Sequence, residues 1–278
     1  ALLVAFFFDP ITKLGNAMRR VAQGDFDVTL DTRHTFREVR QINQDFNLMT
    51  KELGSTEILK TEFVSNVSHE FKTPINAIEG YATLLQDTDL SRDQQQMYVE
   101  KILLNTGRLS KLVGNILLLS KVDNQQIQPH VTTYRLDEQI RQSILALEPL
   151  WTKKDNEFDV DLERVEFTGS ENLLMHVWNN LIENAIKYGP DRGVIAMKLV
   201  QRDQTAVFTI DDEGPGIRPE DRQHIFDRFY QADSSRKTEG NGLGLALVKQ
   251  ILTISGGTIR VDPLPVRGTR FTVTLPME

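Results

Sequence analysis

The chain has 278 residues, a formal net charge of −7 and no cysteine. Its length is enough for two or three domains, and its 40% hydrophobic and 26% charged residues are typical of soluble globular proteins. The acidic balance gives no reason to expect nucleic-acid binding. The lack of cysteine excludes disulfides, thiolate metal sites and thiol nucleophiles.

The chain opens with an apolar run, residues 1–8, that lacks the basic leader of a signal peptide. Such a run is too short to cross a membrane, which takes about 20 apolar residues. Lys13, Arg19 and Arg20 follow it, as expected on the cytoplasmic side of a span. We interpret residues 1–9 as the remnant of a transmembrane helix. The alternative is a short, buried apolar end.

Apolar residues at spacings of three and four predict helices with coiled-coil seams over residues 11–21, 42–53 and 59–67. The step from Leu53 to Leu59 is out of phase with these seams, and such a slip changes the local winding of a coiled coil. We therefore predict that this junction gates a signal passing along the helix.

A helical hairpin is predicted next. Pro74 lies inside its first helix and should kink it. The polar segment 87–93 predicts a loop, and a second seam covers residues 102–116. Two helices with such broad apolar stripes cannot bury them on each other alone, so the pattern favours a dimeric four-helix bundle. Polar residues 125–129 predict a linker.

The rest of the chain combines predicted helices with strands. Such a pattern favours an α+β domain with helices packed on a mixed or antiparallel sheet. The predicted helices cover residues 137–150, 171–188 and 243–254, and the predicted strands cover residues 194–200, 205–210, 258–261 and 269–275.

His69 is the first candidate for chemistry, and helical phase places it opposite the apolar seam. A largely neutral imidazole offers a nitrogen lone pair at pH 7. Glu70 can take the proton from the other ring nitrogen, and Thr73, one turn later, shares the face of His69. Taken alone, a histidine at such a position is more often an ordinary surface residue, and its neighbours change that balance.

Asn180, Asn184, Lys187 and Tyr188 stand on one face of the predicted helix 171–188. Amide oxygens suit Mg²⁺, and lysine can meet a phosphate as a point charge. The tyrosine ring offers a flat apolar surface. The alternative is a plain amphipathic helix.

Asp212 alternates with Phe208 and Ile210 along a predicted strand, so its carboxylate points to the apolar side. A carboxylate at the base of an apolar pocket requires hydrogen-bond donors, and the amino group of adenine is one natural partner. Gly214 and Gly216 let the backbone approach a ligand closely. The alternative is an acidic surface turn.

Gly240, Gly242, Leu243 and Gly244 open a predicted helix, where glycine amides bind phosphate well. This signal is weak by itself, since the spacing matches neither the Rossmann nor the Walker pattern. The polar segment 227–239 before it predicts a mobile lid over a nucleotide.

Together and in this order, these segments resemble the sensor histidine kinase family over nearly the whole chain. They read Ser-His-Glu-Phe-Lys-Thr-Pro at 68–74, Asn-x-x-x-Asn-Ala-x-Lys-Tyr at 180–188, Asp-x-Gly-x-Gly-Ile at 212–217, Ile-Phe-Asp-Arg-Phe-Tyr at 225–230 and Gly-x-Gly-Leu-Gly-Leu at 240–245. Pro10, Glu38 and the segment 45–49 also look like parts of a HAMP signal-relay domain.

The resemblance implies a multidomain fold. An all-α coiled coil and helical hairpin, dimeric as a four-helix bundle, would precede an α+β sandwich of the Bergerat (GHKL) ATP-binding type. The implied boundaries are residues 1–9 for the transmembrane remnant, 10–56 for HAMP, 57–127 for the hairpin and 128–278 for the ATP-binding domain.

The resemblance also implies roles for single residues. His69 would be the phosphoacceptor, Glu70 its general base, and Thr73 a support for phosphatase action. Asn184 would ligate Mg²⁺ and Asp212 would bond the adenine amino group. The other implied nucleotide contacts are Asn180, Lys187, Tyr188, Gly214, Gly216, Ile217, Arg228, Gly240, Gly242, Leu243, Gly244 and Thr269.

The activity implied is autophosphorylation of His69 by ATP with Mg²⁺, followed by transfer to an aspartate of a response regulator. The implied partners are a second copy of the chain and the cell membrane, reached through an upstream transmembrane segment, with this chain as the cytoplasmic portion. Two alternatives stay open. One is an ATPase of the gyrase, mismatch-repair or heat-shock-chaperone kind, which lacks the segment 68–74, and the other is a scaffold that binds ATP as a structural ligand.

Overall fold

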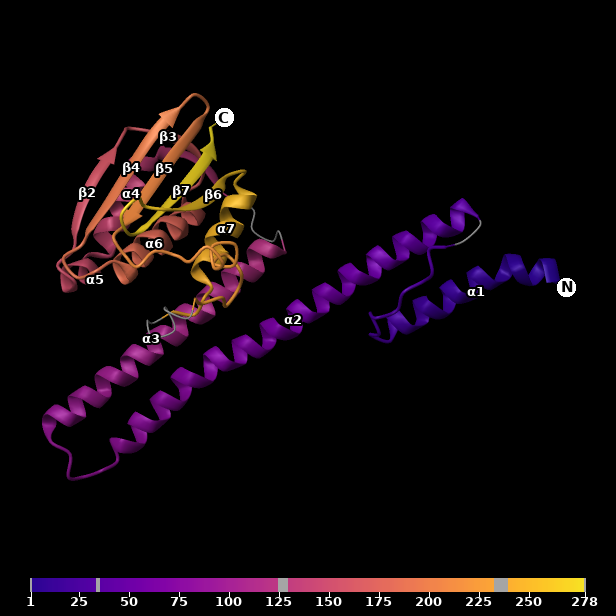
Figure 1. Ribbon diagram of the computed structural model, residues 1–278. Helices are drawn as coiled ribbons and strands as arrows, with labels where there is room; N and C mark the ends of the chain where they lie inside the picture. Colours follow the sequence, from indigo (N-terminus) through magenta and orange to yellow (C-terminus); the bar gives the residue numbers. More distant parts are fainter. Residues whose placement is uncertain (1, 34–35, 125–129, 233–239, 278) are drawn as a thin grey trace. The chain divides into compact units, whose positions relative to one another are not determined.

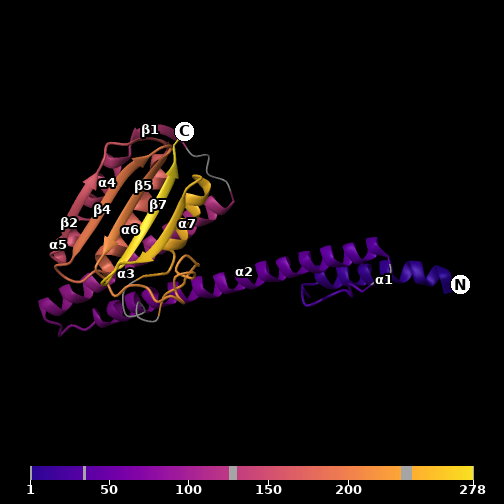
Figure 2. The ribbon, with the colours of Figure 1, turned by 45° about the horizontal axis from the view of Figure 1, so that its top comes forward.

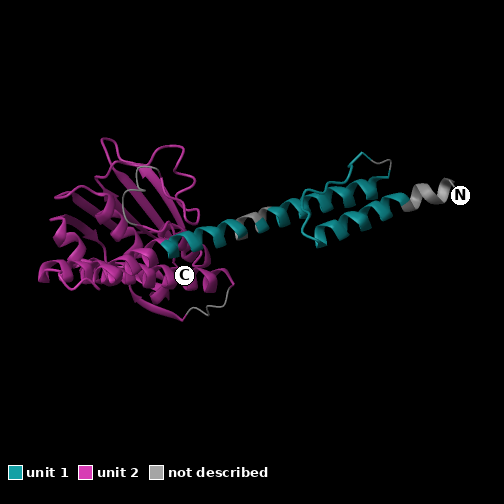
Figure 3. Ribbon diagram, turned by 90° about the horizontal axis from the view of Figure 1, so that it is seen from below, with its two compact units in different colours: residues 1–72 teal, residues 73–278 magenta. Residues whose placement is uncertain are grey.

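The computed structural model describes residues 2–33, 36–124, 130–232 and 240–277, with side chains except at 2–8, 55–56 and 58–60. The predicted linker 125–129 lies outside these ranges. The chain forms two compact units, residues 1–72 and 73–278 (Figure 3). The elements (Figure 1) are α1 (Leu2–Ala22), α2 (Arg37–Leu84), α3 (Arg92–Asp123), β1 (Val131–Arg135), α4 (Leu136–Ala146), α5 (Glu148–Lys153), β2 (Glu157–Leu162), β3 (Glu166–Ser170), α6 (Glu171–Tyr188), β4 (Val194–Arg202), β5 (Thr205–Asp212), α7 (Gly244–Ile254), β6 (Thr258–Pro263) and β7 (Thr269–Pro276).

In the first unit, α1 and the beginning of α2 pack around a small apolar core. Ala17, Val28 and Phe46 are buried there, and Leu14 and Val21 pack against them. The other residues of the two predicted seams, Ile11, Met18, Ile42, Met49 and Leu53, are exposed. The Asn47 side chain accepts a hydrogen bond from the Leu30 amide at 2.7 Å and donates one to the Leu30 carbonyl at 2.8 Å. These two bonds replace a backbone partner and fasten the extended connector to α2.

The helix α2 is continuous from Arg37 to Leu84, through both Pro74 and the out-of-phase junction at 53–59. Pro74 therefore does not interrupt the helix, although it removes one backbone donor. The helix α3 begins one residue after Ser91, which forms a capping box with Gln94. The hairpin loop thus occupies residues 85–91, slightly earlier than predicted.

Along α3, apolar side chains are buried on one side and exposed on another. Leu112, Leu119 and Val122 are buried, whereas Leu103 and Leu117 are 65% and 57% exposed. Among the described residues, α3 is the one helix long and apolar enough to cross a membrane by length and composition. Its exposed leucines are also what a helix leaves open when it requires further helices to complete a bundle.

The second unit contains a five-stranded mixed sheet in the order β2-β4-β5-β7-β6, in which β2 runs parallel to β4 and the other pairs are antiparallel. Figure 2 shows helices α4, α6 and α7 on one face of this sheet. Buried residues alternate along β5 and β7, and Trp178 of α6 packs edge-on against Phe208 of β5, with ring centroids 5.1 Å apart. The predicted two-layer α+β fold is confirmed.

The four predicted strands correspond to β4, β5, β6 and β7, and the predicted helix 171–188 is α6. The single helix predicted over residues 137–150 is wrong. The chain instead forms α4 and α5, with a break at Leu147, because Pro149 takes the first turn of a new helix. The strands β1, β2 and β3 were not predicted.

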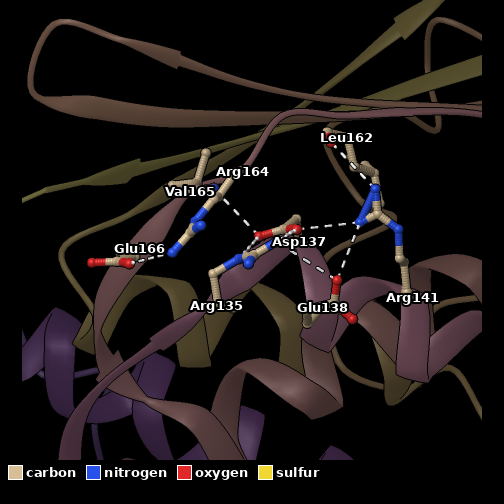
Figure 4. A network of polar contacts seen from close by, with 8 residues as sticks. All are labelled: Arg135, Asp137, Glu138, Arg141, Leu162, Arg164, Val165 and Glu166. Carbon is tan, nitrogen blue, oxygen red and sulfur yellow. Dashed lines mark hydrogen bonds and ion pairs between the residues drawn. The ribbon is translucent and has the colours of Figure 1, made fainter.

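A network of charged side chains joins the beginning of α4 to the turn after β2 (Figure 4). The Asp137 carboxylate is buried and accepts hydrogen bonds from Arg135 Nε at 2.8 Å, from Arg141 Nη1 at 3.2 Å and from the Val165 amide at 3.3 Å. The hydrogen bond from Arg135 is the main reason why the pKa of Asp137 is lowered. The ionised carboxylate therefore stabilises the folded state.

We expect Asp137→Ala to lower the free energy of unfolding by about 2–3 kcal/mol at pH 7, because two arginines and a buried amide lose their acceptor. A lowered pKa contributes stability only above the unfolded pKa, so the difference from the unsubstituted protein should shrink as the pH falls below about 4. Urea unfolding at several pH values measures this. Glu138→Ala is the control, since Glu138 is half exposed at 3.6 Å from Arg135 and should cost less than about 1 kcal/mol. A pH-independent difference would contradict the assignment.

Candidate functional site

His69 lies on the exposed side of α2, as predicted, and Glu70 beside it is half-buried. Burial raises the pKa of Glu70, an effect that the neighbouring His69 partly opposes. A carboxylate with a raised pKa is a stronger proton acceptor, which suits a general base. Thr73 is exposed one turn further along the same helix.

The polar face of α6 meets the glycine-rich segment before α7. A Cβ atom on Gly244 would lie 2.6 Å from Asn180 Oδ1, and one on Gly240 would lie 2.7 Å from Lys187 Nζ. Lys187 Nζ also donates to the Tyr188 hydroxyl at 2.7 Å. Asn184, half-buried, lies on this face one turn after Asn180. The structure therefore brings together residues that the sequence separates by more than fifty positions.

Asp212 ends β5 with a buried side chain, on the same side of the strand as the apolar residues, as predicted. Burial raises the pKa of Asp212 to about 6, against the hydrogen bonds from the amides of Gly214, at 2.8 Å, and Thr269. A Cβ atom on Gly214 would lie 2.7 Å from the Tyr188 carbonyl, so Asp212 and the end of α6 border the same space.

Gly268 permits the close approach of β7 to Asp212. Its φ is +117°, and a Cβ atom there would lie 1.9 Å from the Asp212 carbonyl oxygen. Thr269 follows and is the register partner of Asp212 across the β5–β7 pair. This contact was not deduced from the sequence, in which Gly268 is marked only by its position before Thr269.

Two hydrogen bonds join the glycine-rich segment, residues 240–244, to the first residues of the predicted lid. Phe229, with φ +61°, donates its amide to the Gly242 carbonyl at 2.9 Å, and Gly242 has φ +65°. Gln231 Nε2 donates to the Gly240 carbonyl at 2.7 Å. Leu243, at the N-cap of α7, is fully buried. Residues 233–239 of the predicted lid lie outside the described residues.

Two further predicted contact residues, Arg228 and Ile217, have partners outside α6 and α7. Arg228 forms an ion pair with Asp123 of α3 at 2.7 Å, and Lys111 of α3 pairs with Glu183, the neighbour of Asn184. Ile217 is half-buried, and its carbonyl accepts a hydrogen bond from Arg222. Gly216, with φ +78°, turns the backbone just before Ile217.

The described residues contain no group of three or more histidine or acidic side chains that could hold a metal ion.

Three family models match the chain in succession. They are the HAMP domain over residues 2–55, the His Kinase A (phospho-acceptor) domain over residues 59–125, and the histidine kinase-, DNA gyrase B- and HSP90-like ATPase over residues 169–278.

Two relatives named heme sensor protein HssS align with nearly the whole chain. The protein of Staphylococcus saprophyticus is 37% identical over 269 residues, which are 95% of this chain and 57% of that protein. The protein of Staphylococcus epidermidis is 35% identical over 251 residues, 90% of this chain and 54% of that protein. The chain thus spans a little over half the length of these relatives.

Among solved structures, the Acinetobacter baumannii histidine kinase AdeS is 27% identical with a TM-score of 0.64, over 76% of this chain and 98% of that chain. An ATPase of the gyrase or chaperone kind would account for the last of the three family matches but not for the phospho-acceptor domain before it. The three domains, their order and these relatives show that the chain belongs to the sensor histidine kinase family of two-component systems.

Proposed function

We propose that this protein binds ATP between α6, β5 and α7, phosphorylates His69 and passes the phosphoryl group to an aspartate of a response regulator. The observation that carries the proposal is the buried Asp212 carboxylate beside the polar face of α6, in a chain that also presents an exposed His69 beside a half-buried Glu70. The first arrangement suits an adenine nucleotide, and the second suits a phosphoryl acceptor.

In this proposal Asp212 and Thr269 hold the adenine amino group, and Tyr188 and Ile217 contact the ring. Asn180, Lys187 and the backbone of Gly240, Gly242, Leu243 and Gly244 lie on the phosphate side. His69 Nε2 attacks the terminal phosphorus in line, while Glu70 accepts the proton from Nδ1. The P–N bond forms as the bond to the leaving ADP oxygen breaks, and Thr73 supports later dephosphorylation of the regulator.

The residues present fit a magnesium ion that arrives with the nucleotide. Asn184 supplies one neutral amide oxygen, and Mg²⁺ commonly takes one or two protein ligands together with phosphates and waters. When bound, the ion would offset charge on the phosphates. Arg228 would need to leave Asp123 before it could contact a phosphate.

The exposed apolar side chains of α3 fit a second copy of the chain, with two hairpins forming a four-helix bundle. The apolar start of α1, followed by basic residues, fits attachment to a membrane through an upstream segment, with this chain on the cytoplasmic side. The domain boundaries at residues 9, 56 and 127 belong to the same proposal.

The test is incubation of the chain with γ-labelled ATP and Mg²⁺, followed by exposure of the labelled protein to acid and to alkali. A phosphohistidine should survive alkali, be lost in acid, and disappear when a cognate response regulator is added. Steady release of phosphate without labelled protein would instead indicate an ATPase, and ATP binding without either would indicate a scaffold.

The continuous helix across residues 53–59 supports the prediction of a gate at this junction. One residue added at this junction rotates the later part of α2 by about 100° about the helix axis, relative to the part of α2 before the junction. We therefore expect a one-residue insertion or deletion to change the autophosphorylation rate at least severalfold. Labelling rates of purified variants measure this.

A seven-residue insertion provides the matched control, because it adds almost two whole turns and returns the helix to within about 20° of its phase. It should restore a rate close to that of the unsubstituted chain. If the one-residue insertion, the one-residue deletion and the seven-residue insertion all kept the rate of the unsubstituted chain, the junction would not gate the kinase.

A further inference from the structure

Lys154, which follows α5, caps the end of α6. Its ammonium group donates hydrogen bonds to the carbonyls of Ile186 at 2.9 Å, Lys187 at 3.1 Å and Gly189 at 2.7 Å. Its side chain is 27% exposed, and the Asp191 carboxylate is the nearest acid, at 3.9 Å. All three donors of the ammonium group are therefore used by the backbone of one helix end.

These hydrogen bonds satisfy carbonyls that the end of a helix otherwise leaves without a partner. The last carbonyls of an α-helix have no partner within the helix, and together they carry a partial negative charge. Gly189 returns its own amide to the Ala185 carbonyl at 2.9 Å, but the next carbonyls depend on Lys154. A single cation thus satisfies two of the last carbonyls of α6 and the carbonyl of Gly189, and it opposes the negative charge of the helix end.

Asn156 extends this hold to the turn after α6. Its side chain is buried and donates to the carbonyls of Pro190 at 2.9 Å and Gly193 at 3.2 Å. The backbone adds a bond from the Arg192 amide to the Lys154 carbonyl at 2.9 Å. The corner between α5 and β2 therefore fixes the chain on both sides of Gly189.

The turn held in this way carries part of the nucleotide site. Lys187 and Tyr188 belong to it, and their side chains are joined by the hydrogen bond at 2.7 Å. The Tyr188 carbonyl is so close to Gly214 that a Cβ atom there would approach it to 2.7 Å. A shift of this turn would move Tyr188 relative to Asp212, although the hydrogen bonds of Lys154 go to backbone carbonyls and not to either side chain.

We propose that Lys154 is a positioning residue for ATP binding, which acts by holding the last turn of α6 against the Asp212 loop. The inference rests on the proposed function, because it takes this face as the nucleotide site. A cap on an ordinary helix end would affect stability alone. Here the capped turn presents ligand-binding side chains, so its loosening should weaken the binding of ATP.

The test is Lys154→Met, which keeps the length of the aliphatic side chain and removes the three donors. We expect the KM for ATP in autophosphorylation to rise about tenfold, with kcat within about twofold, because binding is lost equally in the ground and transition states. Lys154→Arg, which keeps donors and charge, should recover most of the affinity.

Two controls separate positioning from stability. Lys153→Met changes the exposed neighbouring lysine and should leave KM and the unfolding midpoint unchanged. Arg141→Met breaks the contacts to Asp137 and the Leu162 carbonyl, so it should destabilise the same domain without moving KM. A fall in kcat at constant KM in Lys154→Met, or an equal KM shift in Arg141→Met, would overturn the proposal.

Calorimetric titration with ATP keeps this result distinct from the test of the kinase activity itself. If the unsubstituted chain binds ATP but is not labelled, the proposed function fails, and the Kd values of the variants still decide the role of Lys154. A tenfold weaker Kd in Lys154→Met alone supports positioning, and an unchanged Kd refutes it.

Discussion

His69→Gln is expected to abolish labelling of the chain by γ-labelled ATP while leaving its affinity for ATP unchanged. Glutamine has a similar length and polarity, but its amide nitrogen is no nucleophile, so no phosphoryl group can be accepted. The side chain of His69 is exposed on α2, and its replacement leaves no cavity. Gel autoradiography measures the label, and calorimetry measures the Kd for ATP.

His130 supplies the matched control, since it is also an exposed histidine and lies outside any predicted motif. His130→Gln should be labelled at the rate of the unsubstituted chain. Label persisting in His69→Gln would place the acceptor elsewhere. Loss of ATP binding in the same variant would mean that His69 contributes to the nucleotide site, and the assignment of roles would then be wrong.

Asp212→Asn is expected to weaken ATP binding by about 10- to 100-fold and, without nucleotide, to make the protein more stable. The Gly214 amide already donates to one carboxylate oxygen at 2.8 Å, so the asparagine oxygen should stay there. The new NH₂ group would then stand where the carboxylate accepts hydrogen bonds. It would face the Thr269 amide and the adenine amino group, which are donors themselves.

The gain in stability follows from the pKa of Asp212, which burial raises from 3.8 to about 6. A raised carboxyl pKa means that ionisation opposes folding. The stabilising contribution is present below about pH 4 and is lost as the pH rises through 6. At pH 8 this penalty is about 3 kcal/mol. Asp212→Asn removes this penalty but loses the hydrogen bond from the Thr269 amide. We therefore expect it to be about 1–2 kcal/mol more stable than the unsubstituted protein at about pH 8.

Urea unfolding at pH 4 and pH 8, without nucleotide, tests this expectation, because the advantage of Asp212→Asn should close at the lower pH. Asp211→Asn is the control. Asp211 pairs with Arg270, whose Nε donates to it at 2.7 Å, on the other side of the strand, and its loss should not weaken ATP binding. An Asp212→Asn protein that binds ATP normally would remove Asp212 from the site.

The parts of the fold that were predictable from sequence have strong periodicity. The strand β5 alternates buried and half-buried residues over its whole length, and α6 keeps a continuous apolar stripe. The strand β2 escaped prediction because three of its six residues are acidic, and it is recognisable only by its pairing with β4. The strands β1 and β3 have five residues each, too few for a period to show.

The site divides in the same way. Residues on one helix face, such as Asn180 and Asn184, could be grouped from spacing, and the side of β5 that carries Asp212 followed from alternation. The contacts of Gly268 with Asp212 and of Lys154 with α6 join segments that only the sheet topology brings together. No local pattern marks Lys154, which sits in a polar corner beside another lysine.

The place of β7 in the sheet also governs when this sheet can be completed during synthesis. This strand follows β6 in the sequence, yet it lies between β5 and β6 and pairs with both. Domains fold as units while the ribosome extends them, and an interior strand cannot be left out of such a unit. The hairpin with His69 therefore emerges long before the ATP-binding layer can close. If the proposed function holds, an interrupted chain that stops before β7 would present His69 without the means to phosphorylate it.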